Sequence, residues 1–268
     1  MITLTVLGCA GSYPNSQSPA SSYLVETSST RVVVDFGNGA LSQLLQRREP
    51  ADIDAFFISH AHADHCLDLL PLYVLLKHAP VDRGGLGERG PIPVYGPREL
   101  PERLVSAYST AGDNDFRQCF DFRPLPDGGA TVPIGDLSVS ASRVAHPGES
   151  YALRFESAGS SLVYSGDTGE CDALLKLARD ADTALFEASF VEPAATEPAL
   201  PANLHMTGRQ AGDTARRAGV RQLIITHLVE WNRVDGRHDR EQREAAVAFG
   251  KEVEVAQLGR TFTIGAAG

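Results

Sequence analysis

The sequence predicts an α/β fold, or the related α+β class, in which helices pack outside β-sheets. Short apolar runs separated by Gly-rich turns fill the first third of the chain, as is typical of strands. The last third alternates helix-like with strand-like stretches, and this alternation indicates helices that cover sheets. The composition, 43% hydrophobic and 22% charged residues over 268 residues, is that of a globular protein with a substantial core.

The first half of the chain is predicted to contain mainly strands. Strands are expected at residues 2–8, 21–27, 31–37 and 53–59, with a helix-like stretch at residues 39–48. One helix is predicted from about Asp64 to residue 79, with Pro71 restricting its start. Residues 80–91 break all periodicity and are expected to form a mobile surface loop. A helix near residues 97–109 precedes the strands predicted at residues 137–146, 151–157 and 161–167.

The second half supplies the helices that alternate with strands. Helices are predicted at residues 171–181, 207–219 and 239–250, and strands at 183–189, 221–227 and 253–259. Residues 191–203 form a Pro- and Ala-rich loop, and long loops in compact domains are often functional. The chain shows no obvious internal repeat and no linker long enough to separate two domains. We therefore expect a single domain over residues 1–268.

Composition limits the classes of partner and compartment. A formal net charge of −10 opposes a large basic surface for nucleic acid, because binding to phosphate backbones depends largely on Lys and Arg. The four cysteines are far apart without a CxxC pair, so they are expected to be reduced. The start of the chain does not resemble a signal peptide, and no run approaches the roughly 20 apolar residues that span a bilayer. We expect a cytoplasmic protein without a membrane segment.

The stretch SHAHADH, residues 59–65, contains three of the eight histidines of the chain and directly follows an apolar run. A solvated turn needs no imidazole cluster, and buried ring nitrogens need partners. The candidate ligands in this stretch are His60, His62, Asp64 and His65. Three further candidates each follow an apolar, strand-like run: His146, Asp167 and His227. Side chains at strand ends can converge at one edge of the sheets, so these seven residues predict one site.

The residue types of this cluster predict a metal centre. Imidazole nitrogen and carboxylate oxygen are the ligands that zinc and related divalent metals use in hydrolytic sites. His60 and His62 can bind one ion, while Asp64 and His65 face a second, and the two oxygens of Asp167 can bridge both ions. Two such ions would activate water and neutralise developing charge. The ligands accept zinc, manganese or iron, and we expect two divalent ions, with zinc preferred.

With these motifs the chain resembles the metallo-β-lactamase superfamily, on SHAHADH, His146, SGDT at Asp167 and THL at His227. The resemblance runs through nearly the whole chain and implies a four-layer αββα sandwich with a dinuclear site. It implies that one metal is bound by His60, His62 and His146, the other by Asp64, His65 and His227, and both by Asp167. It does not define the substrate, because one fold hosts many reactions.

Three stretches are similar to the ribonuclease Z and cyclic-nucleotide phosphodiesterase branch: LGCAGSYP, FEAS and HMTGRQAGDTA. The resemblance implies that His205 contacts the scissile phosphate and protonates the leaving oxygen, with Thr207 capping the following helix. Glu187 could orient His205, and a helix or loop salt bridge is the alternative role for it. Gly11 and Ser12 lie in a Gly loop that could approach a phosphate or could equally be a tight turn.

One departure bears on the substrate. Ribonuclease Z enzymes of the short form insert a tRNA-gripping arm between the ligands that match His146 and Asp167, which here are only 21 residues apart. Across most of its length the chain instead resembles actinobacterial atypical cyclic-nucleotide phosphodiesterases, through LGCAGS, SPAS, ADHCLDL, AHPGES and YSGDTGECD. The prediction is a phosphodiesterase acting on a small phosphodiester such as cAMP, with Asp64, His205 and Glu187 in catalytic roles.

Several alternatives stay open. A tRNA 3′-processing endoribonuclease would need a basic surface supplied elsewhere, so a tRNA partner is not favoured. A carboxylic or thioester hydrolase could use the same centre, and a non-catalytic metal-binding regulator is the alternative from another class. Tyr13, Tyr151 and Trp231 are candidates for stacking a base, with Trp231 preferred because it follows His227 by four residues. A homodimer is implied by the resemblance alone.

Overall fold

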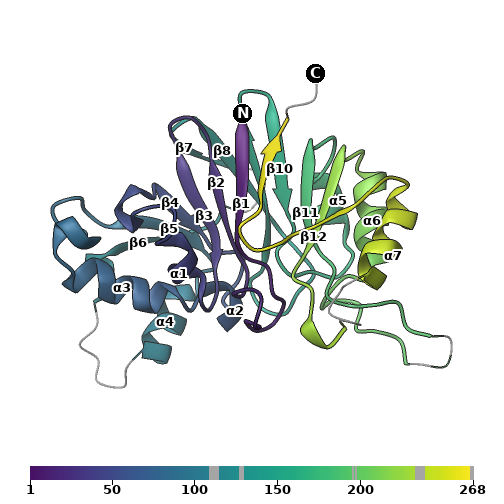
Figure 1. The fold of residues 1–268 in the computed structure, drawn as a ribbon, viewed down its shortest axis with the longest axis horizontal. Helices are drawn as coiled ribbons and strands as arrows, with labels where there is room; N and C mark the ends of the chain where they lie inside the picture. The colour runs from purple at the N-terminus through teal and green to yellow at the C-terminus, as the bar shows by residue number, and fades with distance from the viewer. Residues whose placement is uncertain (109–114, 127–129, 195, 197, 233–238, 266–268) are drawn as a thin grey trace.

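The computed structural model describes residues 1–108, 115–126, 130–194, 196, 198–232 and 239–265. Two β-sheets pack face to face, and helices cover the outer face of each sheet (Figure 1). This arrangement is the four-layer αββα sandwich that the resemblance predicts, and the predicted fold class is confirmed.

The first sheet has the strand order β14-β1-β2-β3-β4-β5-β6 within the described residues. Its strands are β1 (Ile2–Gly8), β2 (Ser22–Glu26), β3 (Arg31–Phe36), β4 (Ala55–Phe57), β5 (Ile92–Gly96), β6 (Phe120–Pro124) and β14 (Thr261–Ile264). The pairs from β14 to β3 are antiparallel, and those from β3 to β6 are parallel. Its outer face carries α1 (Ala40–Leu44), η1 (Pro50–Asp52), α2 (Ala63–Cys66), α3 (Leu69–His78), η2 (Val81–Arg83), α4 (Leu100–Tyr108) and η3 (Phe116–Gln118).

The second sheet has the order β13-β12-β11-β10-β9-β8-β7 within the described residues. Its strands are β7 (Thr131–Ile134), β8 (Leu137–Arg143), β9 (Tyr151–Ser157), β10 (Ser160–Tyr164), β11 (Thr183–Glu187), β12 (Gln222–Thr226) and β13 (Glu254–Val255). The pairs from β7 to β10 are antiparallel, and those from β10 to β13 are parallel. Its helical elements are α5 (Asp172–Leu177), α6 (Gly208–Arg217), η4 (Glu230–Asn232) and α7 (Asp239–Phe249).

The central core fills the space between the sheets. Phe57 of β4 meets Phe155 of β9 edge to face, with ring centroids 5.8 Å apart. Tyr23 of β2 hydrogen-bonds Thr226 of β12 at 2.7 Å and so joins the sheets a second time. Each fully buried side chain of this size contributes about 1.5–3 kcal/mol to folding. These two contacts join β4 to β9 and β2 to β12 across the space between the sheets.

Most predicted strands are confirmed, but β5, β6, β7 and β14 were not predicted. β6 and β7 are edge strands, and neither shows a long apolar run that would mark it as a strand. Pro133 in β7 is tolerated because an edge strand leaves one row of backbone groups unpaired. Local composition is a weak guide for such strands, since partner strands rather than intrinsic preference hold them in place.

The prediction of one helix from Asp64 to residue 79 is wrong, because the chain forms two helices, α2 and α3. The Asp68 N–H donates to the Phe36 carbonyl at 3.0 Å instead of continuing the helical ladder. The Asp68 carboxylate accepts from the Leu41 N–H at 2.7 Å, and Pro71 has no N–H for the carbonyl four residues before it. The break allows α2 to present its ligands separately from α3.

The two predicted loops have different structures. Residues 80–91 contain the short helix η2, and Leu86 is buried in the core under α3, so part of this segment is packed. In residues 191–203, positions 195 and 197 lie outside the described residues, and the rest has neither helix nor strand.

The four cysteines are free, as predicted. Among the described helices, none has the length and apolar character that crossing a bilayer requires.

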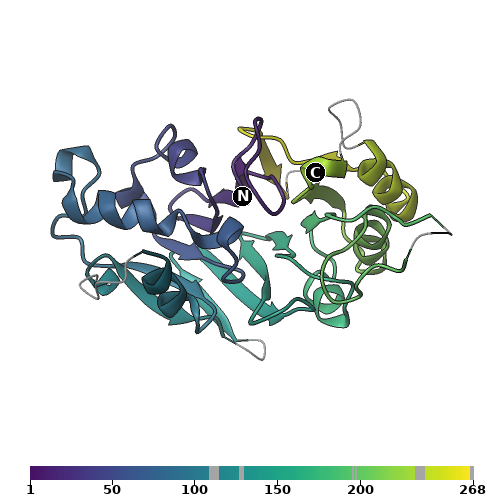
Figure 2. The same ribbon diagram turned by 90° about the horizontal axis from the view of Figure 1, so that it is seen from below.

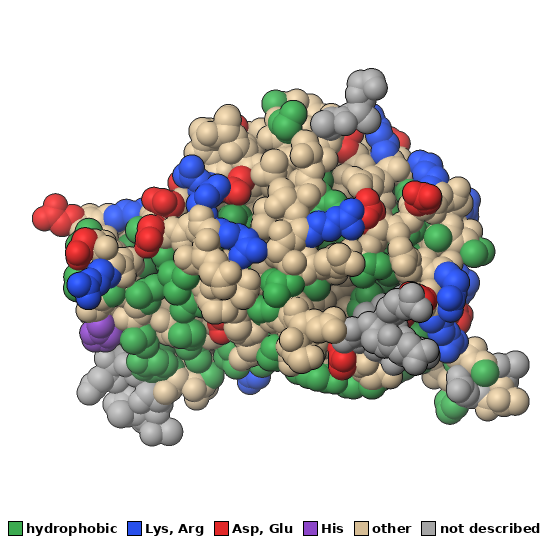
Figure 3. All heavy atoms as spheres, in the orientation of Figure 1, with side chains coloured by type: hydrophobic (Ala, Val, Ile, Leu, Met, Phe, Trp, Pro, Cys, Tyr) green, Lys and Arg blue, Asp and Glu red, His purple; other side chains and the backbone are tan. Residues whose placement is uncertain are grey.

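Surface charge is mixed on the face shown in Figure 3. Lys and Arg side chains lie between Asp and Glu side chains, and the described part of this face has no continuous basic area. This distribution agrees with the net charge of −10.

Candidate metal centre and active site

The structure brings all seven candidate ligands together at one edge of the two sheets. Figure 2 views the molecule from this edge. The segments that follow β4, β8, β10 and β12 carry these residues, with Asp64 and His65 in α2, so parts of the chain 167 residues apart meet in one place. The seven residues are His60, His62, Asp64, His65, His146, Asp167 and His227.

One group of ligand atoms comes from His60, His62, His146 and Asp167, and these atoms lie within 4.8 Å of one another. His60 Nε2 is 3.0 Å from His62 Nδ1, which is 3.2 Å from His146 Nε2. Asp167 Oδ2 is 3.7 Å from His60 Nε2. Three imidazole nitrogens and a carboxylate oxygen therefore surround one small space.

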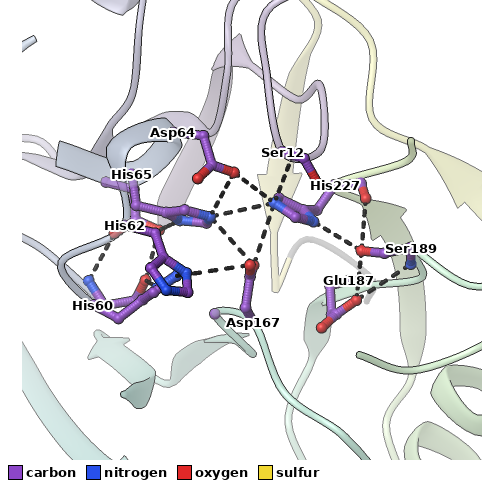
Figure 4. Close-up of polar contacts among 12 residues, drawn as sticks. Ser12, His60, His62, Asp64, His65, Asp167, Glu187, Ser189 and His227 are labelled. Carbon is purple, nitrogen blue, oxygen red and sulfur yellow. Dashed lines mark hydrogen bonds and ion pairs between the residues drawn. The ribbon is translucent and has the colours of Figure 1, made fainter. Parts of the chain in front are cut away.

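A second group comes from Asp64, His65, Asp167 and His227 (Figure 4). The Nε2 atoms of His65 and His227 are 3.2 Å apart, and Asp64 Oδ2 is 3.1 Å from His227 Nε2. Asp167 Oδ1 is 3.3 Å from His65 Nε2 and 3.4 Å from His227 Nε2. Asp167 thus offers one oxygen to each group, which is the bridging position predicted for it.

The donor set fits two divalent cations. In four of the histidines, Nδ1 makes a hydrogen bond to a group outside the seven candidate ligands. The partners are Ser59 Oγ for His60, Asp35 for His65, the Leu204 carbonyl for His146 and Ser189 Oγ for His227. A ring whose Nδ1 donates leaves Nε2 with a free lone pair, and each of these Nε2 atoms faces a ligand group. Lone pairs that face one another at about 3 Å repel unless a cation lies between them.

The charge and burial of these side chains also favour a site for two divalent cations. Among the described residues, Asp167 Oδ1 is a buried atom without a hydrogen-bond partner. Burial lowers the pKa of His60 well below its usual value and also lowers the pKa of His62 and His146, so these rings stay neutral and can act as ligands. Burial alone would raise the pKa of Asp64 and Asp167, but neighbouring histidines hold both below the usual range. Ligation itself remains a prediction.

His65 lies among three carboxylates. Burial lowers its pKa, but the charges of Asp167, Asp64 and Asp35 outweigh burial and raise that pKa well above the usual value. Because Nδ1 already donates to Asp35, an added proton would occupy Nε2, where His65 faces Asp64 and Asp167. The carboxylates therefore favour positive charge at this point, and a divalent cation would take the place of that proton.

Asp35 was not identified from the sequence as part of the site. It lies at 0% exposure near the end of β3, and its backbone has a positive φ of 53°. Its carboxylate accepts from the Ser59 N–H at 2.7 Å, the Ser59 hydroxyl at 2.8 Å, His65 Nδ1 at 2.7 Å and the Tyr164 hydroxyl at 2.7 Å. The sequence contained one feature that could have identified Asp35: it follows an apolar run, as Asp167 does.

Ser189 was also missed, and it connects His227 to Glu187. His227 Nδ1 donates to Ser189 Oγ at 2.8 Å, and this hydroxyl lies 2.7 Å from Glu187 Oε2, to which it donates. Glu187 is fully buried at the end of β11 and also accepts from the Thr168 N–H at 2.7 Å. A buried carboxylate held in this way orients its neighbours.

His205 lies beside the centre and in neither group of four. Its Nδ1 is 3.0 Å from Glu187 Oε1 and 3.9 Å from Asp167 Oδ2. Burial lowers the pKa of His205, but the adjacent Glu187 and then Asp167 outweigh burial and raise that pKa to about 9. Nε2 of His205 has no hydrogen-bond partner among the described residues. The predicted pairing of His205 with the buried Glu187 is present, and with His205 protonated this contact is an ion pair.

The loop before His205 also supports the centre. The Leu204 carbonyl accepts from His146 Nδ1 at 2.7 Å, so adjacent residues hold His146 and carry the His205 ring. Gly169 makes this packing possible, because a Cβ there would lie 2.0 Å from the Ala202 carbonyl oxygen. The segment at residues 202–205, directly at the end of this loop, therefore positions His146 and His205.

The Gly loop packs directly against His227. The Ser12 N–H lies 3.3 Å from His227 Nε2, and a Cβ on Gly11 would lie 2.5 Å from the His227 carbonyl oxygen. Glycine is required here because the backbones of Gly11 and His227 approach each other closely. Contact of Gly11 or Ser12 with a phosphate stays a prediction.

The remaining predicted residues differ in their exposure. Thr207 is the N-cap of α6 and forms a capping box with Gln210, as predicted for the cap. Thr207 is 2% exposed, and substrate contact by its side chain stays a prediction. Tyr151 is fully buried in β9 and cannot stack a base, whereas Trp231 is 69% exposed. Burial raises the pKa of the Cys66 thiol to about 12, which favours a neutral packing residue over a metal ligand.

The fold and the site together define a metal-dependent hydrolase, because His and Asp ligands at the edge of an αββα sandwich form a centre of the hydrolytic type. The beta-lactamase superfamily domain matches residues 30–228, and the chain belongs to that superfamily. Its similarities place it in the ribonuclease Z-like branch of the metallo-β-lactamase fold.

Three relatives illustrate this placement. An uncharacterized protein of Mycobacterium leprae (strain TN) is 41% identical over 98% of this chain and 89% of its own length. The probable metallo-hydrolase YhfI of Bacillus subtilis is 29% identical over 96% of this chain and 97% of its own; its crystal structure gives a TM-score of 0.82 at 26% identity, covering 97% and 98% of the two chains. Ribonuclease Z of Myxococcus xanthus is 28% identical over 89% of each chain.

Proposed function

We propose that the protein is a phosphodiesterase with two divalent metal ions that hydrolyses 3′,5′-cyclic nucleotides such as cAMP. The observation that carries this proposal is the position of His205, held by Glu187 at 3.0 Å and located 3.9 Å from the shared ligand Asp167. A sugar oxygen leaves phosphorus as a strongly basic alkoxide unless it is protonated, so a phosphodiesterase benefits from an acid beside the metal centre.

The residues of the site would have two functions, which are to hold the cations and to protonate the leaving oxygen. The two groups of ligands would hold cations that supply water activation and neutralise negative charge on the phosphate. His205 donates a proton from its ring to the departing ribose oxygen. Glu187 holds His205 through Nδ1 and favours its protonated form, which leaves Nε2 directed to the substrate. Glu187 therefore acts by positioning His205.

The chain between His146 and Asp167 favours a small substrate. The 20 residues between them are taken up largely by β9 and β10, which are joined by a tight turn at Ala158 and Gly159. An arm of the kind that short ribonuclease Z enzymes carry between these ligands does not fit in this interval. The net charge of −10 also disfavours a long phosphate backbone.

Turnover of 3′,5′-cAMP by the protein loaded with zinc, manganese or iron tests the proposal. We expect 5′- or 3′-phosphate products that disappear in Asp64→Ala, which removes a ligand of the second group, and persist in Asp136→Ala, which changes an exposed carboxylate. An unprocessed tRNA and an ester panel are assayed in parallel. Cleavage of the tRNA without cAMP turnover would assign the protein to RNA processing, and ester hydrolysis without any phosphodiesterase activity would assign it to acyl chemistry.

A further inference from the structure

We propose that Tyr13 and Trp231 form a platform on which the base of a nucleotide substrate stacks at the rim of the metal centre. The inference rests on the proposed function, because it assigns the part of the same site that recognises the base. It concerns a surface outside the seven ligands and outside the pair formed by His205 and Glu187.

The two aromatic rings contact each other while remaining open to solvent. Their centroids are 5.8 Å apart with an interplanar angle of 34°. Tyr13 is 40% exposed, and Trp231 is 69% exposed. Each ring is therefore covered in part by the other, and the exposed indole can accept a flat partner. Large aromatic side chains usually bury most of their apolar area, so an exposed pair indicates a binding surface.

Both residues lie close to the second group of ligands. Tyr13 directly follows Ser12, whose N–H is 3.3 Å from His227 Nε2, and Trp231 follows His227 by four residues in η4. The Gly11 N–H donates to the Leu228 carbonyl at 3.1 Å, which joins the two segments beside the centre. Figures 1 and 2 show the loop after β1 and η4 side by side at the ligand edge. Since consecutive Cα atoms are about 3.8 Å apart, the Tyr13 backbone lies within nucleotide length of His227.

Polar contacts hold the segments that carry the platform. Asn15 Nδ2 donates to Glu230 Oε2 at 2.8 Å, which links the loop of Tyr13 to η4. Asn232 Nδ2 donates to the Ser189 carbonyl at 2.8 Å, which anchors η4 to the chain after β11. The two rings are thus positioned before any ligand binds, and less conformational entropy is lost on binding.

A nucleobase fits this position better than a charged group. The phosphate of a cyclic nucleotide belongs with the cations, and its base extends away from the phosphate as a flat, uncharged ring. Stacking on an aromatic side chain contributes about 1–3 kcal/mol per base and does not require a particular base. The platform therefore predicts hydrolysis of both adenine and guanine cyclic nucleotides, with purines preferred over pyrimidines because their larger rings overlap more of the indole.

Kinetics with and without a base test the platform. The two substrates are cAMP and the methyl riboside 3′,5′-cyclic phosphate, which has the same scissile group and no base. In Trp231→Ala the ratio of kcat/KM for cAMP to that for the base-free substrate should fall about 5- to 150-fold, the equivalent of the stacking energy. Trp231→Phe should restore most of the ratio. Val247→Ala, which alters an 85% exposed side chain of α7, is the control and should leave the ratio unaltered.

Fluorescence gives a second readout that does not need turnover. Trp231 is the single tryptophan of the chain, so its emission reports on the platform alone. Titration with adenosine 5′-monophosphate should quench this emission, and ribose 5-phosphate should not. Tyr13→Phe should preserve the quenching, and Tyr13→Ala should weaken it.

The outcomes separate the platform from the proposed function. If the protein hydrolyses cAMP and Trp231→Ala leaves the substrate ratio unaltered, the platform is wrong and the phosphodiesterase proposal stands. If no cyclic nucleotide is hydrolysed, the proposed function fails, and the fluorescence titration still decides the platform. Quenching by the adenine nucleotide alone supports the platform, and equal responses to both ligands overturn it.

Discussion

The carboxylate of Asp35 accepts a hydrogen bond from His65 Nδ1 at 2.7 Å, and both side chains are fully buried. This contact selects the tautomer of His65 in which Nε2 is free to face Asp64, Asp167 and His227. Asp35 therefore controls the geometry of the second group of ligands without belonging to it.

Replacing Asp35 with Asn should weaken metal binding by about 10- to 100-fold, the range found for outer partners of metal ligands. The amide is isosteric but has only one acceptor oxygen, so it cannot accept from Ser59, His65 and Tyr164 as the carboxylate does. Metal content after dialysis against graded chelator concentrations measures the effect. Asp136→Asn is the control, and equal metal retention in both variants would contradict the role of Asp35.

The replacement His205→Ala should lower kcat for cAMP by about 10²- to 10⁴-fold while two metal ions remain bound. The reason is that His205 belongs to neither group of four ligands and would act on the leaving oxygen. However, His205, Glu187 and His227 also lie within a distance that could hold an ion. Elemental analysis of the variant separates the two roles, because a parallel loss of metal would make His205 a ligand or a structural residue.

The replacement Glu187→Gln should shift the alkaline limit of activity to lower pH. Glu187 is the main group that raises the pKa of His205 to about 9. Activity that needs protonated His205 is present below this pKa and is lost as the pH rises through it, so a lower pKa brings the loss to lower pH. The profile of kcat from pH 6 to 10 measures the shift relative to the parent protein. Glu156→Gln, on the exposed side of β9, should leave the profile in place; the same shift in both variants would argue against a specific effect.

The replacement Gly11→Ala should destabilise the protein by about 1–3 kcal/mol and reduce the metal content of the second group. A methyl group at this position would lie 2.5 Å from the His227 carbonyl oxygen, so one of the two backbones must move. Chemical denaturation measures the free energy of unfolding, and elemental analysis measures bound metal. Normal stability together with full metal content would show that the Gly loop is not needed to place His227.

The seven candidate ligands could be identified from the sequence because their chemistry is local. SHAHADH places several side chains of metal-binding type in one turn, and His146, Asp167 and His227 each follow an apolar run that forms or leads into a strand. Three other features depend on neighbours in space. They are the parallel and antiparallel order of the strands, the edge strands β6, β7 and β14, and the division of residues 64–79 into two helices. Local patterns carry little of that information.

By itself, the sequence determined the fold class, the seven candidate metal ligands and the pairing expected between Glu187 and His205, since residue type and strand position set these features. Only the tertiary structure decided which atoms face each other. It placed Asp35, Ser189 and the Leu204 carbonyl behind the histidines, and it buried Tyr151 while exposing Trp231 beside Tyr13. The physical reason is that hydrogen-bond partners and burial depend on segments far apart in the chain, which only packing of the two sheets brings together.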